Sequence, residues 1–235
     1  MKRFIILLAA ALLAASCIKG EPFICRSLVM GNFVGGDLLV DGGLTFHVVK
    51  MQVDVTAKPE DRVIALCDVM KQTGSSDKEY DVKLLDYDFP LNKAPLVSSA
   101  VTDWEAVGDD PVIPSRYWFS GGFFNMLVKY YYIYRTEKTH VLNLVKDDAR
   151  SNADTLFFSL RHNAAGETPG AADIDINNLV EGAVYATFPI ADSFPAGRDS
   201  VVVKVSGKWY TGSSFGIDPS TQPYSYVGVC YKEDL

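Results

Sequence analysis

The stretch FFNMLVKYYYIY, residues 123–134, carries an apolar or aromatic side chain at every even-numbered position. Its odd-numbered positions are mixed and include the polar residues Asn125 and Lys129. An apolar face that repeats every two residues predicts a β-strand with one side against a core. The preceding segment, residues 112–119, is also rich in aromatic and β-branched residues and leads to the turn Gly121-Gly122. The two segments therefore predict a β-hairpin.

Five further segments of the second half show the same period of two and are separated by turn residues. Together with the hairpin they give about seven short strands, which predicts an all-β domain built as a β-sandwich. One helical turn is possible at residues 176–181. The five segments are residues 141–145, 155–162, 183–190, 200–206 and 224–231.

The first half also alternates, but its alternation changes phase within a strand. Apolar residues stand at even positions from Leu44 to Val48 and at odd positions from Met51 to Val55. A shift by one residue would turn the second set away from the core. One extra residue near Val48-Val49, a β-bulge, would keep both sets on the same core.

Residues 80–89 repeat this change of phase, with apolar residues at positions 82 and 84 and then at 85, 87 and 89. Long strands that change faces midway suit a small, strongly curved sheet. The first half is therefore expected to form a small β-barrel.

At 235 residues the chain is longer than one typical domain. The segment 90–111 carries three prolines and mixed polar residues, which places the domain boundary there. The expected organisation is a signal peptide at 1–16, a tether at 17–30, a barrel at 31–92 and a sandwich at 96–235.

The N-terminus has the order of a secretory signal. Lys2 and Arg3 precede a run of 12 residues without a charge, Phe4–Ala15, and small residues close that run. The run is too short to span a bilayer, which needs about 20 helical residues. We therefore expect export from the cytoplasm.

Residues 13–17, Leu-Ala-Ala-Ser-Cys, resemble the lipobox of bacterial lipoproteins. The resemblance implies cleavage before Cys17 and lipidation of that residue, with the membrane as a partner through the lipid. An ordinary signal peptide with a chance cysteine is the alternative. Residues 18–21 hold no acidic run, which favours an outer-membrane lipoprotein on the periplasmic face rather than the cell surface.

Charge and cysteine content restrict the possible roles further. Removal of Lys2 and Arg3 moves the formal charge from −7 to −9, and an acidic chain is a poor candidate for binding nucleic acid. The cysteines Cys25, Cys67 and Cys230 have no zinc-like spacing. A disulfide between Cys67 and Cys230 is possible, although Cys67 fits a small buried hydrophobe better.

Three stretches of the second half are more specific than alternation. They are Gly108–Val112 leading into Tyr117–Gly122, then His140–Val145, then Leu160–Glu167. In this order and spacing the chain resembles the NigD-like lipoproteins of Bacteroidetes. The resemblance implies an OB-type barrel followed by an immunoglobulin-like sandwich, and it implies no catalytic or binding residues.

The chain shows no arrangement typical of an enzyme, cofactor or metal site. His47, His140 and His162 form no HxH or HExxH pattern, so only the fold could gather them. His162 is expected to end a strand with hydrogen bonds. The carboxylate pairs Asp109-Asp110, Asp147-Asp148 and Asp173/Asp175 stand beside turn residues, where Asp commonly bonds the backbone. Catalysis and calcium binding are the less favoured alternatives for them.

Aromatic side chains are the best sequence lead to a binding surface. Trp104, Tyr131 and Trp209 are candidates for stacking against a sugar or a peptide, whereas the alternative is that they fill the edges of the sandwich core. The sequence therefore favours a non-catalytic envelope lipoprotein that binds a protein partner or an accessory component. A carbohydrate-binding lipoprotein that uses exposed aromatics is the second hypothesis.

Overall fold

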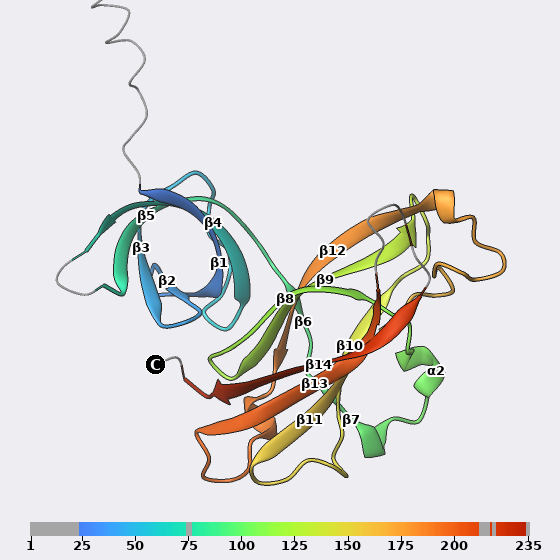
Figure 1. Cartoon of the computed structure of the whole chain (residues 1–235). Helices are drawn as coiled ribbons and strands as arrows, with labels where there is room; N and C mark the ends of the chain where they lie inside the picture. Colours follow the sequence, from blue (N-terminus) through green and yellow to red (C-terminus); the bar gives the residue numbers. More distant parts are fainter. Residues whose placement is uncertain (1–23, 74–76, 212–216, 218–219, 234–235) are drawn as a thin grey trace, which may run out of the picture.

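The computed structural model describes residues 24–73, 77–211, 217 and 220–233. These residues form a closed barrel and a two-sheet sandwich that lie side by side (Figure 1). The expected all-β fold is thus confirmed. Cys17, the predicted lipidation site, lies outside the described residues. No helix in the described part of the chain is long and apolar enough to cross a membrane.

Five strands close the N-terminal barrel in the order β1-β2-β3-β5-β4. Neighbouring strands are antiparallel except β3 and β5, which are parallel. Side chains from every strand meet in one core that includes Leu38, Phe46, Val63, Val82 and Leu84. The strands are β1 (Cys25–Val34), β2 (Asp37–Val40), β3 (Leu44–Met51), β4 (Arg62–Gln72) and β5 (Glu79–Asp88).

Both predicted changes of phase are β-bulges. The register between β3 and β5 shifts between Val48 and Lys50, which leaves Val49 as the extra residue. On β5, Asp86 pairs with Leu66 and Leu84 pairs with Cys67, so Leu85 is the extra residue there. Each bulge bends its strand and helps the short sheet to close.

The continuation of the strand through residues 51–55 was predicted wrongly in part. β3 ends at Met51, whose side chain is 60% exposed rather than directed at the core. Val53 and Val55 do pack against the barrel core, but from an irregular segment outside the sheet. Alternation alone does not distinguish a continued strand from an irregular segment here, because Val53 and Val55 pack against the core in both cases.

The barrel begins and ends earlier than the predicted limits of 31 and 92. β1 starts at Cys25, where pairing with β4 already joins Cys25 to Val69. Residues 25–30 therefore belong to the sheet, whereas the expected tether ran to residue 30. At the other end, β6 (Leu91–Asn92) pairs with a strand of the sandwich.

The proline-rich segment also contributes a second short strand and two helical turns. β7 (Leu96–Val97) pairs with β10, and a 3₁₀ turn follows at Ser98–Ala100. The one-turn helix α2 (Trp104–Val107) is capped by the Asp103 carboxylate, which accepts a hydrogen bond from Ala106 N at 2.9 Å.

The sandwich pairs a five-stranded sheet, β14-β13-β11-β10-β7, with a four-stranded sheet, β6-β12-β9-β8. Phe124, Met126 and Val128 of β9 are fully buried between the sheets, as their alternation predicts. Tyr134 lies beyond the end of β9 and is exposed. The longer strands are β8 (Ile113–Ser120), β9 (Phe123–Ile133), β10 (Val141–Lys146), β11 (Thr155–Asn163), β12 (Leu179–Pro189), β13 (Ser200–Tyr210) and β14 (Thr221–Tyr231).

Two smaller expectations are also settled. The possible helical turn is a 3₁₀ turn at Ile176–Asn178, and β12 follows it directly. Cys67 lies in the core of the barrel and Cys230 in the core of the sandwich, so no disulfide joins them. Burial raises the pKa of the Cys67 thiol to about 12, which keeps it protonated.

Candidate functional site

A tight turn of the barrel meets a tight turn of the sandwich at the domain junction. Asp41-Gly42 connects β2 and β3, and Ser120 ends β8 just before the turn to β9. The backbone N–H of Gly42 donates to Ser120 Oγ at 3.0 Å. This contact between the two turns places Asp41, the first residue of the barrel turn, against the sandwich.

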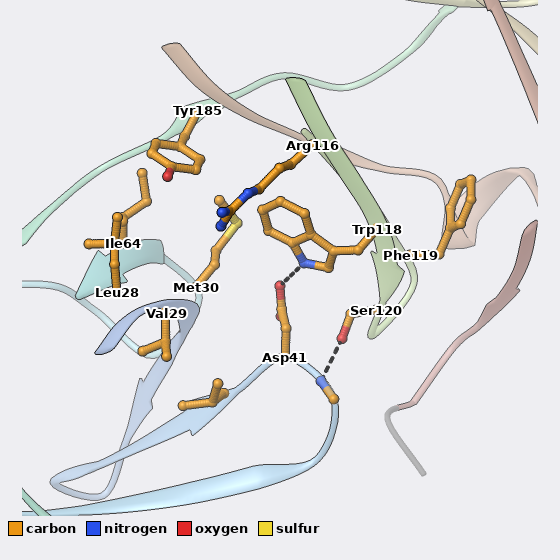
Figure 2. Close-up of a pocket in the computed structure, with 12 residues that line it drawn as sticks. Leu28, Val29, Met30, Asp41, Ile64, Arg116, Trp118, Phe119, Ser120 and Tyr185 are labelled. Atoms are coloured by element: carbon orange, nitrogen blue, oxygen red, sulfur yellow. Dashed lines mark hydrogen bonds between the residues drawn. The ribbon is translucent and has the colours of Figure 1, made fainter. Parts of the chain in front are cut away.

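Asp41 is the centre of a buried polar network at this junction. Its Oδ2 accepts hydrogen bonds from Arg62 Nη2 of the barrel and from Trp118 Nε1 of the sandwich, both at 2.7 Å. The side chains of Arg62 and Asp41 are 3% and 10% exposed. Figure 2 shows the indole of Trp118 pointing at the Asp41 carboxylate. Burying a charged pair is costly unless its other polar groups are also hydrogen-bonded. Arg62 Nη1 donates to Asn32 Oδ1 at 3.1 Å, whereas Arg62 Nε is buried without a hydrogen-bond partner among the described residues.

Asn125, fully buried on β9, supplies further partners from the sandwich. Its Oδ1 accepts from Arg62 Nη2 at 3.2 Å and from Thr187 Oγ1 at 2.7 Å. The Arg62 guanidinium also lies over the Phe123 ring, 4.6 Å from its centroid. We call Asp41, Arg62, Trp118 and Asn125 the interdomain clamp, because their contacts join both domains.

A groove of about 410 Å³ opens beside the interdomain clamp. Leu28, Met30 and Ile64 line it from the barrel, and Arg116, Trp118 and Tyr185 line it from the sandwich. Figure 2 shows the side chains of both sets directed toward the space between the domains. We call these six residues the junction groove.

Alternation on β8 decides which aromatic side chains reach the junction groove. Arg116 and Trp118 point toward the barrel. Tyr117 and Phe119 point the other way: Tyr117 stacks on Tyr226 at 3.8 Å between ring centroids, and Phe119 packs against Phe124. The rings that the sequence shows side by side at 117–119 therefore divide between the sandwich edge and the groove.

Arg116 is the exposed cation of the junction groove. Within the described residues, no carboxylate lies at ion-pair distance from its guanidinium, in contrast to Arg62. An arginine without an ion-pair partner among the described residues, beside a tryptophan and a tyrosine, has the composition of an interface hot spot. The groove can thus accept an apolar group with a carboxylate next to it.

The three aromatic residues predicted from the sequence have different neighbours. Trp104 lies under the Arg161 guanidinium at 5.5 Å, and Tyr131 packs edge-on against Tyr210 at 5.2 Å. Trp209 packs at 6.0 Å against Tyr224, beside the sandwich core. Among the residues that the structure describes, no contact joins the three into one platform, and as ligand-binding residues they remain a prediction.

The carboxylate pairs mostly bond loop backbone, the role that their turn-like surroundings favour. Asp110, Asp147, Asp148 and Asp175 each accept a hydrogen bond from a backbone N–H. Hydrogen bonds from Ser98 and its neighbour lower the pKa of Asp148 to about 2. These carboxylates stabilise turns and do not converge on a cleft.

The three stretches that carry the family resemblance meet at one place in the sandwich. A Cβ on Gly108, whose φ is +77°, would lie 2.4 Å from the carbonyl oxygen of His162, so only glycine fits there. Asp110 N donates to the same oxygen at 2.8 Å, and the Asp110 carboxylate accepts from Ala164 N. The first stretch is thereby fixed to the third.

The second stretch joins them through its histidine. His140 Nδ1 lies 3.2 Å from His162 Nε2, and His140 Nε2 lies 3.4 Å from Glu167 Oε2. Burial, reinforced by His140, lowers the pKa of His162 to about 4, so this ring is neutral at pH 7. The sequence did not predict this cluster, because its members are far apart in the chain and follow no motif.

The fold and the groove together define a class: a two-domain β protein whose barrel and sandwich are fixed by a buried polar clamp beside an open groove. Residues 95–192 match the family described as the NigD-like C-terminal beta sandwich domain. This match confirms the resemblance to the NigD-like family over residues 95–192 of the sandwich.

Solved structures of similar fold come from Bacteroides and Parabacteroides species. A NigD-like immunity protein of Bacteroides caccae is 15% identical, with a TM-score of 0.60 over 87% of this chain and 97% of that one. A candidate toxin-related protein of Parabacteroides distasonis is 19% identical, with a TM-score of 0.60 over 89% and 96%. A candidate lipoprotein of Bacteroides fragilis is 16% identical, with a TM-score of 0.53 over 86% and 96%. No curated protein matches the chain.

Proposed function

We propose that this protein is a lipid-anchored, non-catalytic protein of the cell envelope, and that its junction groove binds a segment of a partner protein. The lipid on Cys17 would hold the chain at the outer membrane, on the periplasmic side. The bound segment would place an apolar side chain between the domains and a carboxylate on Arg116.

One observation carries the proposal: the junction groove is preorganised by a buried polar network. The interdomain clamp fixes both walls before any partner arrives, so binding need not order them, and such preorganisation favours affinity. Clefts between domains are frequent sites of recognition. Arg116, Trp118 and Tyr185 are also the residue types that most often supply binding energy at protein interfaces.

The comparisons support a role in the envelope in general terms. The similar structures include an immunity protein and a candidate lipoprotein, and these descriptions name no enzyme. The carbohydrate-binding alternative has less support, because Trp104, Tyr131 and Trp209 contact different neighbours. No observation here favours it over the groove.

A crosslinking experiment in intact cells tests the groove. We expect a photoreactive phenylalanine analogue at Tyr185 to give one defined protein adduct, because this side chain lines the groove. The same analogue at Tyr134, an exposed residue just beyond the end of β9 that is farthest from the Gly121-Gly122 turn, is the matched control and should not give that adduct. Adducts are identified by mass spectrometry.

Dependence on Arg116 separates specific binding from chance proximity. Arg116→Ala in the Tyr185 crosslinking chain should reduce the adduct at least 10-fold, about 1.4 kcal/mol of lost affinity. Equal adducts from both positions, or an adduct that Arg116→Ala leaves unchanged, would refute partner binding in the groove.

A further inference from the structure

Two imidazole rings face each other in the wall of a second cavity, inside the sandwich. This cavity of about 230 Å³ is lined by Leu91, Lys93 and Tyr130 in addition to His140 and His162. The nitrogens that face each other are His140 Nδ1 and His162 Nε2, at 3.2 Å. The His162 ring is buried and the His140 side chain is only 9% exposed, and the 3.2 Å separation leaves no room for water between them.

The outer nitrogen of each ring faces an acceptor. His140 Nε2 lies 3.4 Å from the Glu167 carboxylate, and His162 Nδ1 lies 3.4 Å from the carbonyl oxygen of Pro111. Glu167 is only 1% exposed and accepts further hydrogen bonds from Ile133 N and Thr136 Oγ1, so it is ionised and cannot donate. A carbonyl oxygen never donates. Both acceptors are satisfied when each outer nitrogen carries the hydrogen of its ring.

The hydrogens on the outer nitrogens determine the state of the two inner nitrogens, His140 Nδ1 and His162 Nε2. A neutral imidazole has only one N–H, and in this arrangement each ring donates it on its outer side. The two facing nitrogens then present lone pairs to each other at 3.2 Å. If a ring carries its hydrogen on the inner nitrogen instead, the lone-pair repulsion moves to the outer side, between His140 and Glu167 or between His162 and Pro111. A positive centre between His140 and His162, either a shared proton or a metal ion, would remove it.

The geometry matches a metal ion as that centre. Two metal–nitrogen bonds of about 2.0–2.1 Å, at an angle close to tetrahedral, join nitrogens that are about 3.2–3.4 Å apart. Histidine ligands of metals commonly donate their second N–H to a carboxylate or to a backbone carbonyl. Glu167 and Pro111 are in the positions for these two roles.

We propose that His140 and His162 bind one transition-metal ion of the zinc type, through Nδ1 and Nε2 respectively, and that Glu167 orients His140. No group of three or more His, Cys, Asp or Glu side chains is placed to bind a metal within the described ranges. The site is therefore open, with its other positions directed to the cavity, and binds more weakly than a closed structural zinc site. The proposal is independent of the junction groove.

Zinc titration of the detergent-purified protein, first freed of metal with a chelator, tests the site by calorimetry. We expect one Zn²⁺ per chain to depend on both rings, with His140→Gln and His162→Gln each weakening binding at least 10-fold. Glu167→Gln should weaken it by about 10-fold through loss of orientation. His47→Gln is the control, because His47 lies on the barrel beside Asp37 and leaves this site intact.

A measurement on the unaltered chain covers the case in which a variant fails to fold. In the nitrogen-15 spectrum of the histidine rings, Zn²⁺ should shift Nδ1 of His140 and Nε2 of His162 and leave His47 in place. Absence of binding overturns the proposal, and so does binding that neither histidine variant affects. Ring nitrogens that respond to pH but not to saturating Zn²⁺ identify a shared proton instead, which equally overturns it.

Discussion

Replacing Arg62 with alanine is expected to lower the free energy of unfolding by about 3–5 kcal/mol, the usual cost of removing one partner from a buried ion pair. The guanidinium is 3% exposed, donates to Asp41 at 2.7 Å and lies over the Phe123 ring. Its loss leaves the Asp41 carboxylate in a dry junction with fewer donors. Urea unfolding followed by tryptophan fluorescence measures the change, and Trp118 in the interdomain clamp is a local probe.

The barrel offers a matched control for Arg62→Ala. Arg26 forms a two-pronged ion pair with Asp68, at 2.7 and 3.1 Å, but the Arg26 side chain is 56% exposed. Solvent weakens such pairs, so Arg26→Ala should leave stability nearly unchanged. If both variants unfold at the urea concentration of the original protein, the interdomain clamp does not hold the domains together.

Phe124→Ala is expected to destabilise the sandwich by about 3–5 kcal/mol, as for other fully buried phenylalanines. The ring is inaccessible to solvent and stacks against Phe188, with centroids 6.3 Å apart, so truncation leaves a cavity between the two sheets. Thermal or urea unfolding followed by circular dichroism measures the loss.

Val227→Ala on β14 is the control for Phe124→Ala. Val227 is 53% exposed on the outer side of an edge strand, so its truncation should change the stability by less than about 0.5 kcal/mol. A loss below about 1 kcal/mol for Phe124→Ala would mean that the two sheets do not pack through this residue.

Alternation was enough to predict the two domains and their curvature. The phase changes near Val48 and Leu85 each required an extra residue, and a bulge is the local structure that supplies one. Phe124, Met126 and Val128 were predicted on one face, and all three are fully buried. These features depend on neighbours in the sequence, so a single strand contains the information.

Short strands and strand ends were less predictable. Leu91–Asn92 and Leu96–Val97 are two-residue strands, too short for a period to be recognised, and they exist only because β12 and β10 are available for pairing. The start at Cys25 was likewise set by pairing with β4. Tertiary contacts, rather than local preference, determine such limits.

Neither candidate site could be assembled from the sequence, because each depends on contacts between distant residues. Asp41 and Trp118 are 77 positions apart, and His140, just before β10, is 22 positions from His162 on β11. The sequence showed only part of their surroundings, the stretch that contains His162. It did not show which side chains these surroundings place together.

Partner affinity measured with and without Arg116 tests the central claim, recognition in the junction groove, most directly. The protein captured through Tyr185 would be purified and titrated by calorimetry against the unaltered chain, Arg116→Ala and the control Lys204→Ala, which lies on the exposed outer face of β13. We expect Arg116→Ala to weaken binding roughly 30-fold, about 2 kcal/mol, and Lys204→Ala to leave it unchanged. Equal affinity for the unaltered chain and Arg116→Ala would contradict recognition of the partner in the groove.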